Sequence, residues 1–278
     1  MRVIIILTAS GALVAAGCGG SARSGREEIV AGFYPLAFAA QEVGGARVEV
    51  RDLTPAGVEP HDLELSPRDV QAVRSADLVL LLGHGFQPQV EKAAGSGERV
   101  LRLLDIPRLR LLPGDPHVWL DPVRYALIVR GIGRALHRRR AADRLVTRLQ
   151  SLDVDYRRGL SGCARREIVT SHEAFSYLAQ RYGLKEVAIT GLSPEAEPTP
   201  RRLSHVIDLV RSTHARTIFF ERLVSPRIAD TVARETGART AVLDPIEGLT
   251  PGEERRGDNY FSLMRANLAA LRKALGCR

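Results

Sequence analysis

The amino-acid sequence predicts an α/β fold in which two lobes, each built on a parallel sheet, are joined by a long, rigid backbone helix. Three observations carry this prediction. Short apolar runs alternate with longer helical patterns in both halves of the 278-residue chain, proline follows a capping residue at several helix starts, and residues 122–160 show no strand signal. Strands separated by helices are typical of βαβ units and parallel sheets. We place the N-terminal lobe at 27–137, the connecting helix at 138–160 and the C-terminal lobe at 161–278.

Short apolar runs mark the strands, four in each half. The N-terminal runs are 29–31, 48–53, 78–82 and 100–103, and the C-terminal runs are 168–170, 187–189, 217–220 and 240–243. Runs this short favour strands over helices.

Helix starts are marked by a side chain that can accept from free backbone N–H groups, followed directly by proline. These pairs are Ser66-Pro67, Asp121-Pro122, Thr199-Pro200 and Ser225-Pro226. Gly237 is placed to end the helix that begins at Ser225, because glycine readily adopts the left-handed conformation of a helix C-terminus.

The connecting segment has the pattern of one amphipathic helix. Its apolar residues recur at three- and four-residue steps: Leu145, Leu149, Leu152, Tyr156 and Leu160. A helix of about 20 residues spans about 30 Å, enough to run along both lobes. We therefore expect limited opening and closing of the lobes.

The N-terminus predicts a lipoprotein leader. Residues 1–17 hold a basic start and an apolar run too short to span a membrane, which indicates a signal peptide. The sequence Ala-Ala-Gly-Cys ending at Cys18 resembles a bacterial lipobox, and residues 18–26 form a flexible tether. We expect an extracytoplasmic protein anchored to the bacterial cell membrane by lipidated Cys18, in the periplasmic space or at the cell surface. An ordinary signal peptide cut near a chance cysteine is the alternative.

The chain is basic, with a formal charge of +8, and arginine is scattered along it with its densest run at 138–140. Nucleic acid is excluded as a partner, because the protein is expected to be secreted and no basic motif is interleaved with aromatic residues. We interpret the run as a solvated helix face that anionic lipid headgroups could attract. We expect the protein to be a monomer.

Two cysteines remain after Cys18. An oxidising compartment favours a disulfide between Cys163 and Cys277, which would fix the final helix on the second lobe. Two buried or free thiols are the alternative, because the sequence does not give their separation.

Three histidines and one aspartate predict a metal site. They are His61 in Glu-Pro-His, His117 in His-Val-Trp-Leu-Asp-Pro, His172 in Ser-His-Glu-Ala-Phe, and Asp244 after an apolar run. Three imidazoles and a carboxylate suit Zn²⁺ better than Mn²⁺, which prefers oxygen donors. Ligands of open α/β sheets gather at the carboxyl ends of strands, and two come from each half. The site is therefore expected at the interface of the lobes.

Three further residues are candidates for supporting roles. Glu221 either orients an imidazole or is a plain carboxylate at a strand end, and Glu197 is a second acid that would balance the charge of the ion. His84, in Gly-His-Gly, is an alternative ligand.

The motifs, in this order, resemble those of the metal-binding solute-binding proteins of bacterial ABC importers, the zinc-uptake component A family. The resemblance covers essentially the whole mature chain and includes segments 191–198 and 218–221. It implies that His61, His117, His172 and Asp244 hold the ion, and that an ABC importer permease and its ATPase are the partners. Zinc-uptake members often carry a His-rich loop between the first two ligands. Here residues 83–115 contain only His84, so no second loading site is expected.

Several alternatives stay open within and beyond this class. A manganese or iron carrier of the same family is one, and a surface adhesin lipoprotein is another. A secreted zinc hydrolase would keep an open water position on the metal, which a fourth ligand at Asp244 would close, and the chain lacks His-Glu-x-x-His. We expect no enzyme. Because ligation needs neutral imidazoles, we expect zinc affinity to weaken as the pH falls through about 6.5.

Overall fold

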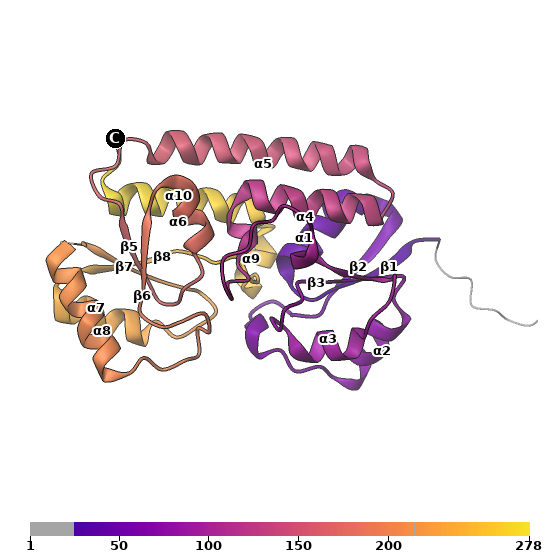
Figure 1. The fold of residues 1–278 in the computed structure, drawn as a ribbon, viewed down its shortest axis with the longest axis horizontal. Helices are drawn as coiled ribbons and strands as arrows, with labels where there is room; N and C mark the ends of the chain where they lie inside the picture. The colour runs from indigo at the N-terminus through magenta and orange to yellow at the C-terminus, as the bar shows by residue number, and fades with distance from the viewer. Residues whose placement is uncertain (1–24, 214) are drawn as a thin grey trace, which may run out of the picture.

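A computed structural model describes residues 25–213 and 215–278 and shows two α/β lobes side by side beneath one long helix (Figure 1). The predicted signal peptide and Cys18 lie outside the described residues. No helix in the described part is both long enough and apolar enough to cross a membrane.

The N-terminal lobe holds a four-stranded parallel sheet in the order β2-β1-β3-β4. Its strands are β1 (Glu27–Ala31), β2 (Val48–Asp52), β3 (Leu78–Leu81) and β4 (Val100–Arg102). Its helices are α1 (Tyr34–Gly44), α2 (Pro67–Ser75), α3 (Pro88–Ala94) and α4 (Pro122–Ala135). Successive strand residues point to opposite faces. Ile29 and Leu80 therefore pack toward α1 and α4, whereas Val30 and Val79 pack toward α2 and α3.

The C-terminal lobe repeats the arrangement, with strands in the order β6-β5-β7-β8. They are β5 (Glu167–Thr170), β6 (Lys185–Ala188), β7 (Thr217–Phe220) and β8 (Arg239–Val242). Its helices are α6 (Ser176–Tyr182), α7 (Pro200–Thr213), α8 (Arg227–Thr236), α9 (Pro251–Arg256) and α10 (Tyr260–Leu275). One face of the sheet packs on α7 and α8, and the other on α6 and α10.

The connecting helix is α5 (Arg139–Leu160), and all five apolar residues of its predicted stripe are buried. Figure 1 shows α10 running alongside α5, and the Tyr156 hydroxyl in α5 donates to the carbonyl of Met264 in α10 at 2.6 Å. At its start, α10 reaches the N-terminal lobe, where the rings of Tyr260 and Tyr125 have centroids 4.6 Å apart. The lobes therefore share one continuous core.

The predicted fold class is confirmed, and every predicted strand is present with its bounds shifted by at most two residues. Ser66 and Asp121 cap α2 and α4, and Gly237 ends α8 with φ +70°. The helix predicted from Ser225 starts one residue late, with Pro226 at the N-cap position. The division of the chain at 137 and 160 stays a prediction.

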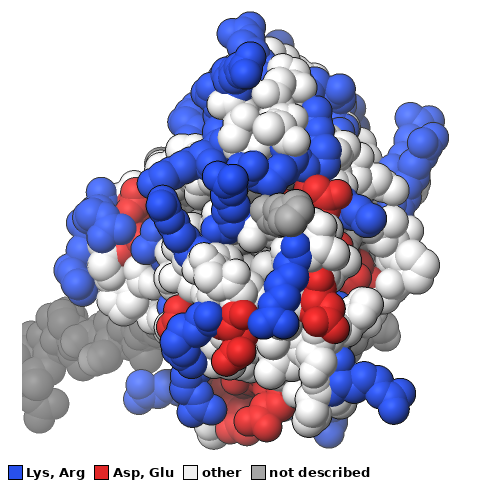
Figure 2. Space-filling view, turned by 90° about the vertical axis from the view of Figure 1, so that its left-hand side faces the viewer, with Lys and Arg blue, Asp and Glu red and all other residues white. Residues whose placement is uncertain are grey.

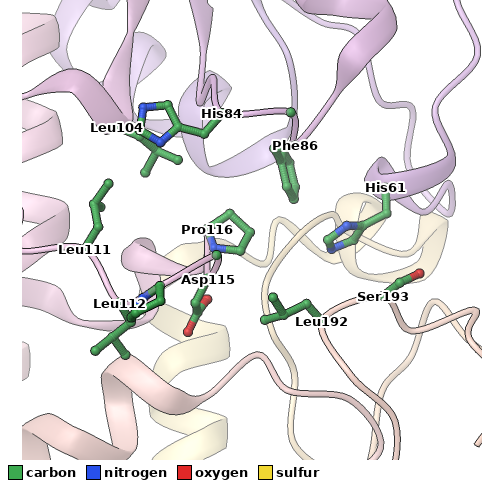
Figure 3. A pocket seen from close by; sticks show the side chains of 13 residues that line it. His61, His84, Phe86, Leu104, Leu111, Leu112, Asp115, Pro116, Leu192 and Ser193 are labelled. Carbon is green, nitrogen blue, oxygen red and sulfur yellow. The ribbon is translucent and has the colours of Figure 1, made fainter.

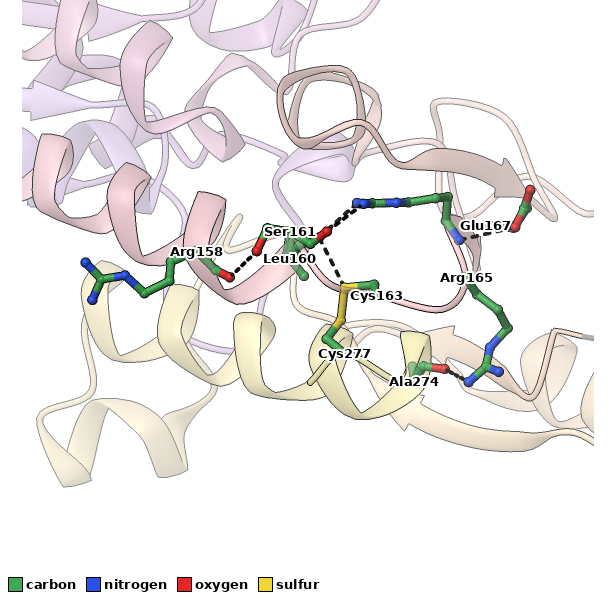
Figure 4. The surroundings of a disulfide bond; sticks show 9 residues. Arg158, Leu160, Ser161, Cys163, Arg165, Glu167, Ala274 and Cys277 are labelled. Atoms are coloured by element: carbon green, nitrogen blue, oxygen red, sulfur yellow. Dashed lines mark hydrogen bonds between the residues drawn. A yellow bond between two sulfur atoms is a disulfide. The ribbon is translucent and has the colours of Figure 1, made fainter.

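Cys163 and Cys277 form a disulfide (Figure 4). It joins the segment that follows α5 to the residues that follow α10, and the two cysteines also pair as an antiparallel bridge. The last turn of α10 is thereby fixed on the C-terminal lobe.

Candidate metal centre

Four side chains converge between the lobes: His61, His117, His172 and Glu247. One nitrogen or oxygen of each lies within 4.8 Å of the others. The side chains of His117, His172 and Glu247 are completely buried, whereas that of His61 is 14% exposed. The cluster is therefore buried except at His61, where it reaches solvent.

His61 lies in a 3₁₀ turn, Pro60–Asp62, that follows β2. Oε1 of the Glu59 carboxyl group accepts from the backbone N–H of His61 at 3.2 Å and caps this turn. The ring of Phe86 meets the His61 imidazole edge-on, with centroids 4.7 Å apart. The N-terminal lobe thus fixes both the backbone and the ring plane of His61.

His117 precedes a second 3₁₀ turn, Val118–Leu120, that leads into α4. Asp115 Oδ1 accepts from the backbone N–H of His117 at 2.9 Å and lies 2.8 Å from its Nδ1. Since a carboxylate only accepts, Nδ1 carries the hydrogen and the lone pair of Nε2 faces the cluster. This nitrogen lies 3.0 Å from Glu247 Oε1.

His172 follows β5 and is oriented in the same way from the other lobe. Its Nδ1 donates to Glu221 Oε1 at 2.6 Å, and the Ser171 hydroxyl donates to the same oxygen. Its Nε2 lies 3.4 Å from the Nε2 of His117. Once each imidazole is deprotonated, two nitrogen lone pairs thus face the same small volume from opposite lobes.

Glu247 comes from the loop that follows β8. Neither of its carboxylate oxygens has a hydrogen-bond partner among the described residues, and the same holds for Nε2 of His61. Buried polar atoms are nearly always paired, so unpaired atoms converging on one volume indicate the place of a cation.

Asp244, the residue predicted from the sequence as the fourth ligand, is not in this cluster. Its Oδ1 accepts from the backbone N–H of Ile246 at 2.7 Å, and its Oδ2 lies 3.6 Å from Nε of Arg222. The carboxylate thus shapes the turn after β8, and the chain needs three more residues to reach the lobe interface at Glu247. Burial raises the pKa of Asp244 to about 7.

The candidates for supporting roles divide. Glu221 contacts His172, which agrees with the first of its two predicted roles, the orientation of an imidazole. Glu197 is exposed and, among the described residues, forms no hydrogen bond or ion pair with the cluster. His84 lies outside it, half exposed, with Nε2 2.9 Å from Asp105 Oδ1. Asp115, which holds His117, was missed by the sequence reasoning, although an acid two residues before a histidine motif is a visible signal.

A cavity of about 420 Å³ lies beside the cluster, and His84 and His61 both line it. Figure 3 shows His61 and Phe86 of the N-terminal lobe facing Leu192 of the C-terminal lobe across this space. Because His61 is the one partly exposed member of the cluster, the cavity gives solvent its route to that side chain.

The electrostatics of the cluster favour a positive charge. Burial lowers the pKa of His172, but the carboxylates of Glu221 and Glu247 outweigh it and hold that pKa well above the usual value. The pKa of His117 is raised likewise, because Asp115 and Glu247 outweigh burial. Burial raises the pKa of Glu247, but the three imidazoles lower it well below its ordinary value.

Glu59 adds no second negative charge. Burial and the neighbouring Glu247 raise the pKa of Glu59 to about 9, so this carboxyl is neutral at pH 7. The charge that faces a bound cation therefore comes from Glu247.

Two lobes with a buried three-histidine, one-carboxylate cluster between them define a metal-binding protein of the two-lobed, solute-capturing kind. The family described as the periplasmic zinc-uptake complex component A (ZnuA) matches residues 29–274, and the chain belongs to that family. The resemblance noted from the sequence motifs is confirmed.

Curated relatives include the zinc-binding lipoprotein AdcA of Streptococcus pneumoniae strain R6, which is 34% identical over 303 residues. That alignment covers 98% of this chain and 60% of AdcA, so the chain spans about three-fifths of that relative. The high-affinity zinc uptake system protein ZnuA of Bacillus subtilis strain 168 is 32% identical, with 95% of this chain and 94% of the relative covered.

Two solved structures are similar to this protein over 90% of its chain. The Zn(II)-bound ZnuA-like domain of S. pneumoniae AdcA has a TM-score of 0.77 at 36% identity, covering 90% of this chain and 99% of that domain. The laminin-binding protein of Streptococcus agalactiae, described as having adhesin and metal-transporting activity, has a TM-score of 0.81 at 31% identity. The matched region covers 90% of this chain and 99% of the laminin-binding protein.

Proposed function

We propose that this protein captures one Zn²⁺ between its lobes and delivers it to an ABC importer in the membrane. One observation carries the proposal: three imidazole nitrogens and one carboxylate oxygen lie within 4.8 Å of one another. Four such donors match the tetrahedral N/O coordination that Zn²⁺ prefers. The Zn(II)-bound relative supports the choice of metal.

His61, His117, His172 and Glu247 are the proposed ligands. Asp115 and Glu221 hold the Nδ1 hydrogens of His117 and His172, which fixes the ring planes and makes each Nε2 a better donor. Three nitrogen donors favour Zn²⁺ over Mn²⁺, which is better served by oxygen. Zn²⁺ with one carboxylate leaves a charge of about +1, which Asp115 and Glu221 offset from just outside the ligands.

Transport, not catalysis, fits this donor set. A catalytic zinc keeps an open position for water, whereas four protein ligands fill a tetrahedral site. The shared core and the parallel helices α5 and α10 restrict the lobes to small movements. Release at the permease therefore needs only a local change, for which the partly exposed His61 is the accessible ligand.

Delivery implies partners that the chain does not contain. We propose that the permease and ATPase of an ABC importer receive the ion, that Cys18 carries the lipid anchor in the extracytoplasmic space, and that the protein acts as a monomer. The adhesin, manganese and iron alternatives stay predictions; the donor set favours zinc over manganese.

Competition titration tests the proposed function. The metal-free protein is titrated with Zn²⁺ and separately with Mn²⁺ against a chromophoric chelator. We expect one tight zinc site, much weaker manganese binding, and loss of the zinc site in His172→Ala. Tighter binding of Mn²⁺ would overturn the assignment of the metal, and binding of neither ion would overturn the function.

A further inference from the structure

The end of the C-terminal lobe carries a dense group of basic side chains. Figure 2 views this end and shows Lys and Arg gathered over its upper part, whereas Asp and Glu lie mainly in the lower part. This surface belongs to the opposite end of the molecule from β1, where the described chain starts (Figure 1). The proposed zinc function makes no use of it.

A hollow of about 680 Å³ opens in this region between the edge strand β8 and the helix α10. Four cationic side chains line it, those of Arg165, Arg216, Arg239 and Lys273. The α10 residues that face β8 across it, Ala270 and Ala274, have short side chains and so leave the space open.

The charge of this hollow is not neutralised within the protein. No acidic residue lines it, and among the described residues none of its four cations forms an ion pair. Some arginines elsewhere are neutralised by acids: Arg181, for example, pairs with both Asp121 and Asp153. A concave surface lined by one sign of charge concentrates the electrostatic field and attracts an ion of opposite sign.

One wall of the hollow is held rigidly by the disulfide. Arg165 donates from its guanidinium to the carbonyl of Ala274 at 2.8 Å and from its backbone N–H to the carbonyl of Leu275 at 3.1 Å. Figure 4 shows this arginine beside the bond between Cys163 and Cys277, which joins the same two segments. Fixing a cation before binding reduces the entropy lost when an anion arrives.

We propose that this hollow binds a phosphate-bearing anion. Guanidinium groups match the geometry of phosphate oxygens and bind them through paired, charge-assisted hydrogen bonds. Arg216 precedes β7 and Arg239 is the first residue of β8. Because these neighbouring strands are parallel, both arginines lie at the amino end of the sheet. Several converging cations suit a multivalent phosphate better than a single carboxylate. The group comes either from a free phosphate compound or from an anionic lipid headgroup.

Pyrophosphate is the probe for the free compound. Isothermal titration calorimetry is carried out on the full chain freed of metal with EDTA, so that chelation of zinc by the probe does not contribute, at about 100 mM salt. The test variant is Arg216→Gln/Arg239→Gln. The matched control is Arg47→Gln/Arg74→Gln, which removes two exposed arginines of the N-terminal lobe and changes the net charge equally.

The expected result is saturable binding that weakens about tenfold or more in Arg216→Gln/Arg239→Gln and less than about twofold in the control. Equal weakening in both double variants would overturn the proposal, because net charge alone would then explain binding. Zinc titration of both variants should match the wild type, so failure of this site and failure of the zinc site are distinguishable.

Vesicle sedimentation distinguishes the two sources of the phosphate group, a lipid headgroup and a free phosphate compound. Vesicles of phosphatidylcholine with about 30% phosphatidylglycerol are compared with phosphatidylcholine alone. Binding to the anionic vesicles that is lost in Arg216→Gln/Arg239→Gln but kept in the control assigns a lipid headgroup, and pyrophosphate binding without vesicle binding assigns a free phosphate. Absence of binding in both experiments would refute the site.

Discussion

Trp119 donates its indole N–H to the carbonyl oxygen of Pro245 at 2.7 Å, and this bond joins the two lobes beside the histidine cluster. Trp119 lies two residues after His117 and Pro245 two residues before Glu247. Trp119 and Pro245 are both buried. One hydrogen bond therefore links the segment that carries His117 directly to the loop that carries Glu247.

Replacing Trp119 by Phe should weaken zinc binding. The substitution keeps an aromatic ring but removes the donor, so the Pro245 carbonyl loses its partner and the Glu247 loop is less well fixed. We expect the zinc Kd to rise about tenfold, the equivalent of about 1.4 kcal/mol, mainly through faster release. Chelator competition and stopped-flow release measure both quantities.

The matched control for Trp119→Phe is Tyr156→Phe. That substitution removes an equally buried hydrogen bond, from the hydroxyl to the Met264 carbonyl, at a distance from the cluster. It should lower the free energy of unfolding by about 1 kcal/mol and leave the zinc Kd unchanged. If both variants lost affinity equally, general destabilisation would explain the effect and the bond to Pro245 would have no special role.

Glu247 and Asp244 should respond very differently to loss of charge. Glu247→Gln removes the proposed carboxylate ligand and should weaken zinc binding by more than about 100-fold, beyond the range of residues that only orient a ligand. Asp244→Asn keeps an oxygen that can accept from Ile246 and should change the Kd by less than about threefold. The reverse order in a chelator competition would restore Asp244 as the ligand.

The metal-free and zinc-loaded proteins should respond to pH with opposite signs. Burial lowers the pKa values of His117 and His172, but their carboxylate partners outweigh it and raise both. A group with a raised pKa stabilises the fold below its unfolded pKa, about 6.5, and that contribution is lost as the pH rises through the folded pKa. Zinc requires the same imidazoles to be deprotonated, so its stabilisation grows with pH.

Scanning calorimetry between about pH 6 and pH 9 checks this prediction against the histidine reference value. The Tm of the metal-free protein should fall across this window, and the gap between the loaded and metal-free forms should widen. His84→Asn, which changes a half-exposed histidine outside the cluster, should leave both curves unchanged. A metal-free Tm that rises with pH would contradict the raised pKa values of the buried pair.

Removing the disulfide should cost stability without changing zinc affinity. Cys163 and Cys277 are 114 residues apart, and a loop of this length predicts a loss of about 4–5 kcal/mol in the free energy of unfolding for the double Cys→Ser variant. Denaturant unfolding measures the loss, and reduced wild-type protein should reproduce it. A large change in zinc affinity would mean that the disulfide also positions the distant histidine cluster.

The parallel sheets were predictable because strands buried on both faces read as continuous apolar runs. Leu78, Val79, Leu80 and Leu81 show this, since all four are buried. The three histidines were predictable because each lies near the carboxyl end of a strand or before a capped helix. Neither inference needed any knowledge of contacts that are distant in sequence.

The place of Glu247 in the cluster, where it is the proposed fourth ligand, was not predictable, because the turn that follows β8 leaves no sequence signal. Ile246 adopts φ +58°, a conformation that normally favours Gly or Asn and that is costly for a β-branched residue. The turn is stabilised by tertiary contacts instead, with Asn267 accepting from the N–H of Asp244 and donating to its carbonyl. Such distant contacts redirect the chain so that Glu247, not Asp244, reaches the histidines.

The most direct test of the account is anomalous diffraction at the zinc edge from crystals grown with one equivalent of Zn²⁺. The account predicts a single ion bound by His61, His117 and His172 and by one oxygen of Glu247, at about 2.0–2.2 Å from each donor atom. An ion held by Asp244 or His84, or placed anywhere other than the lobe interface, would contradict it.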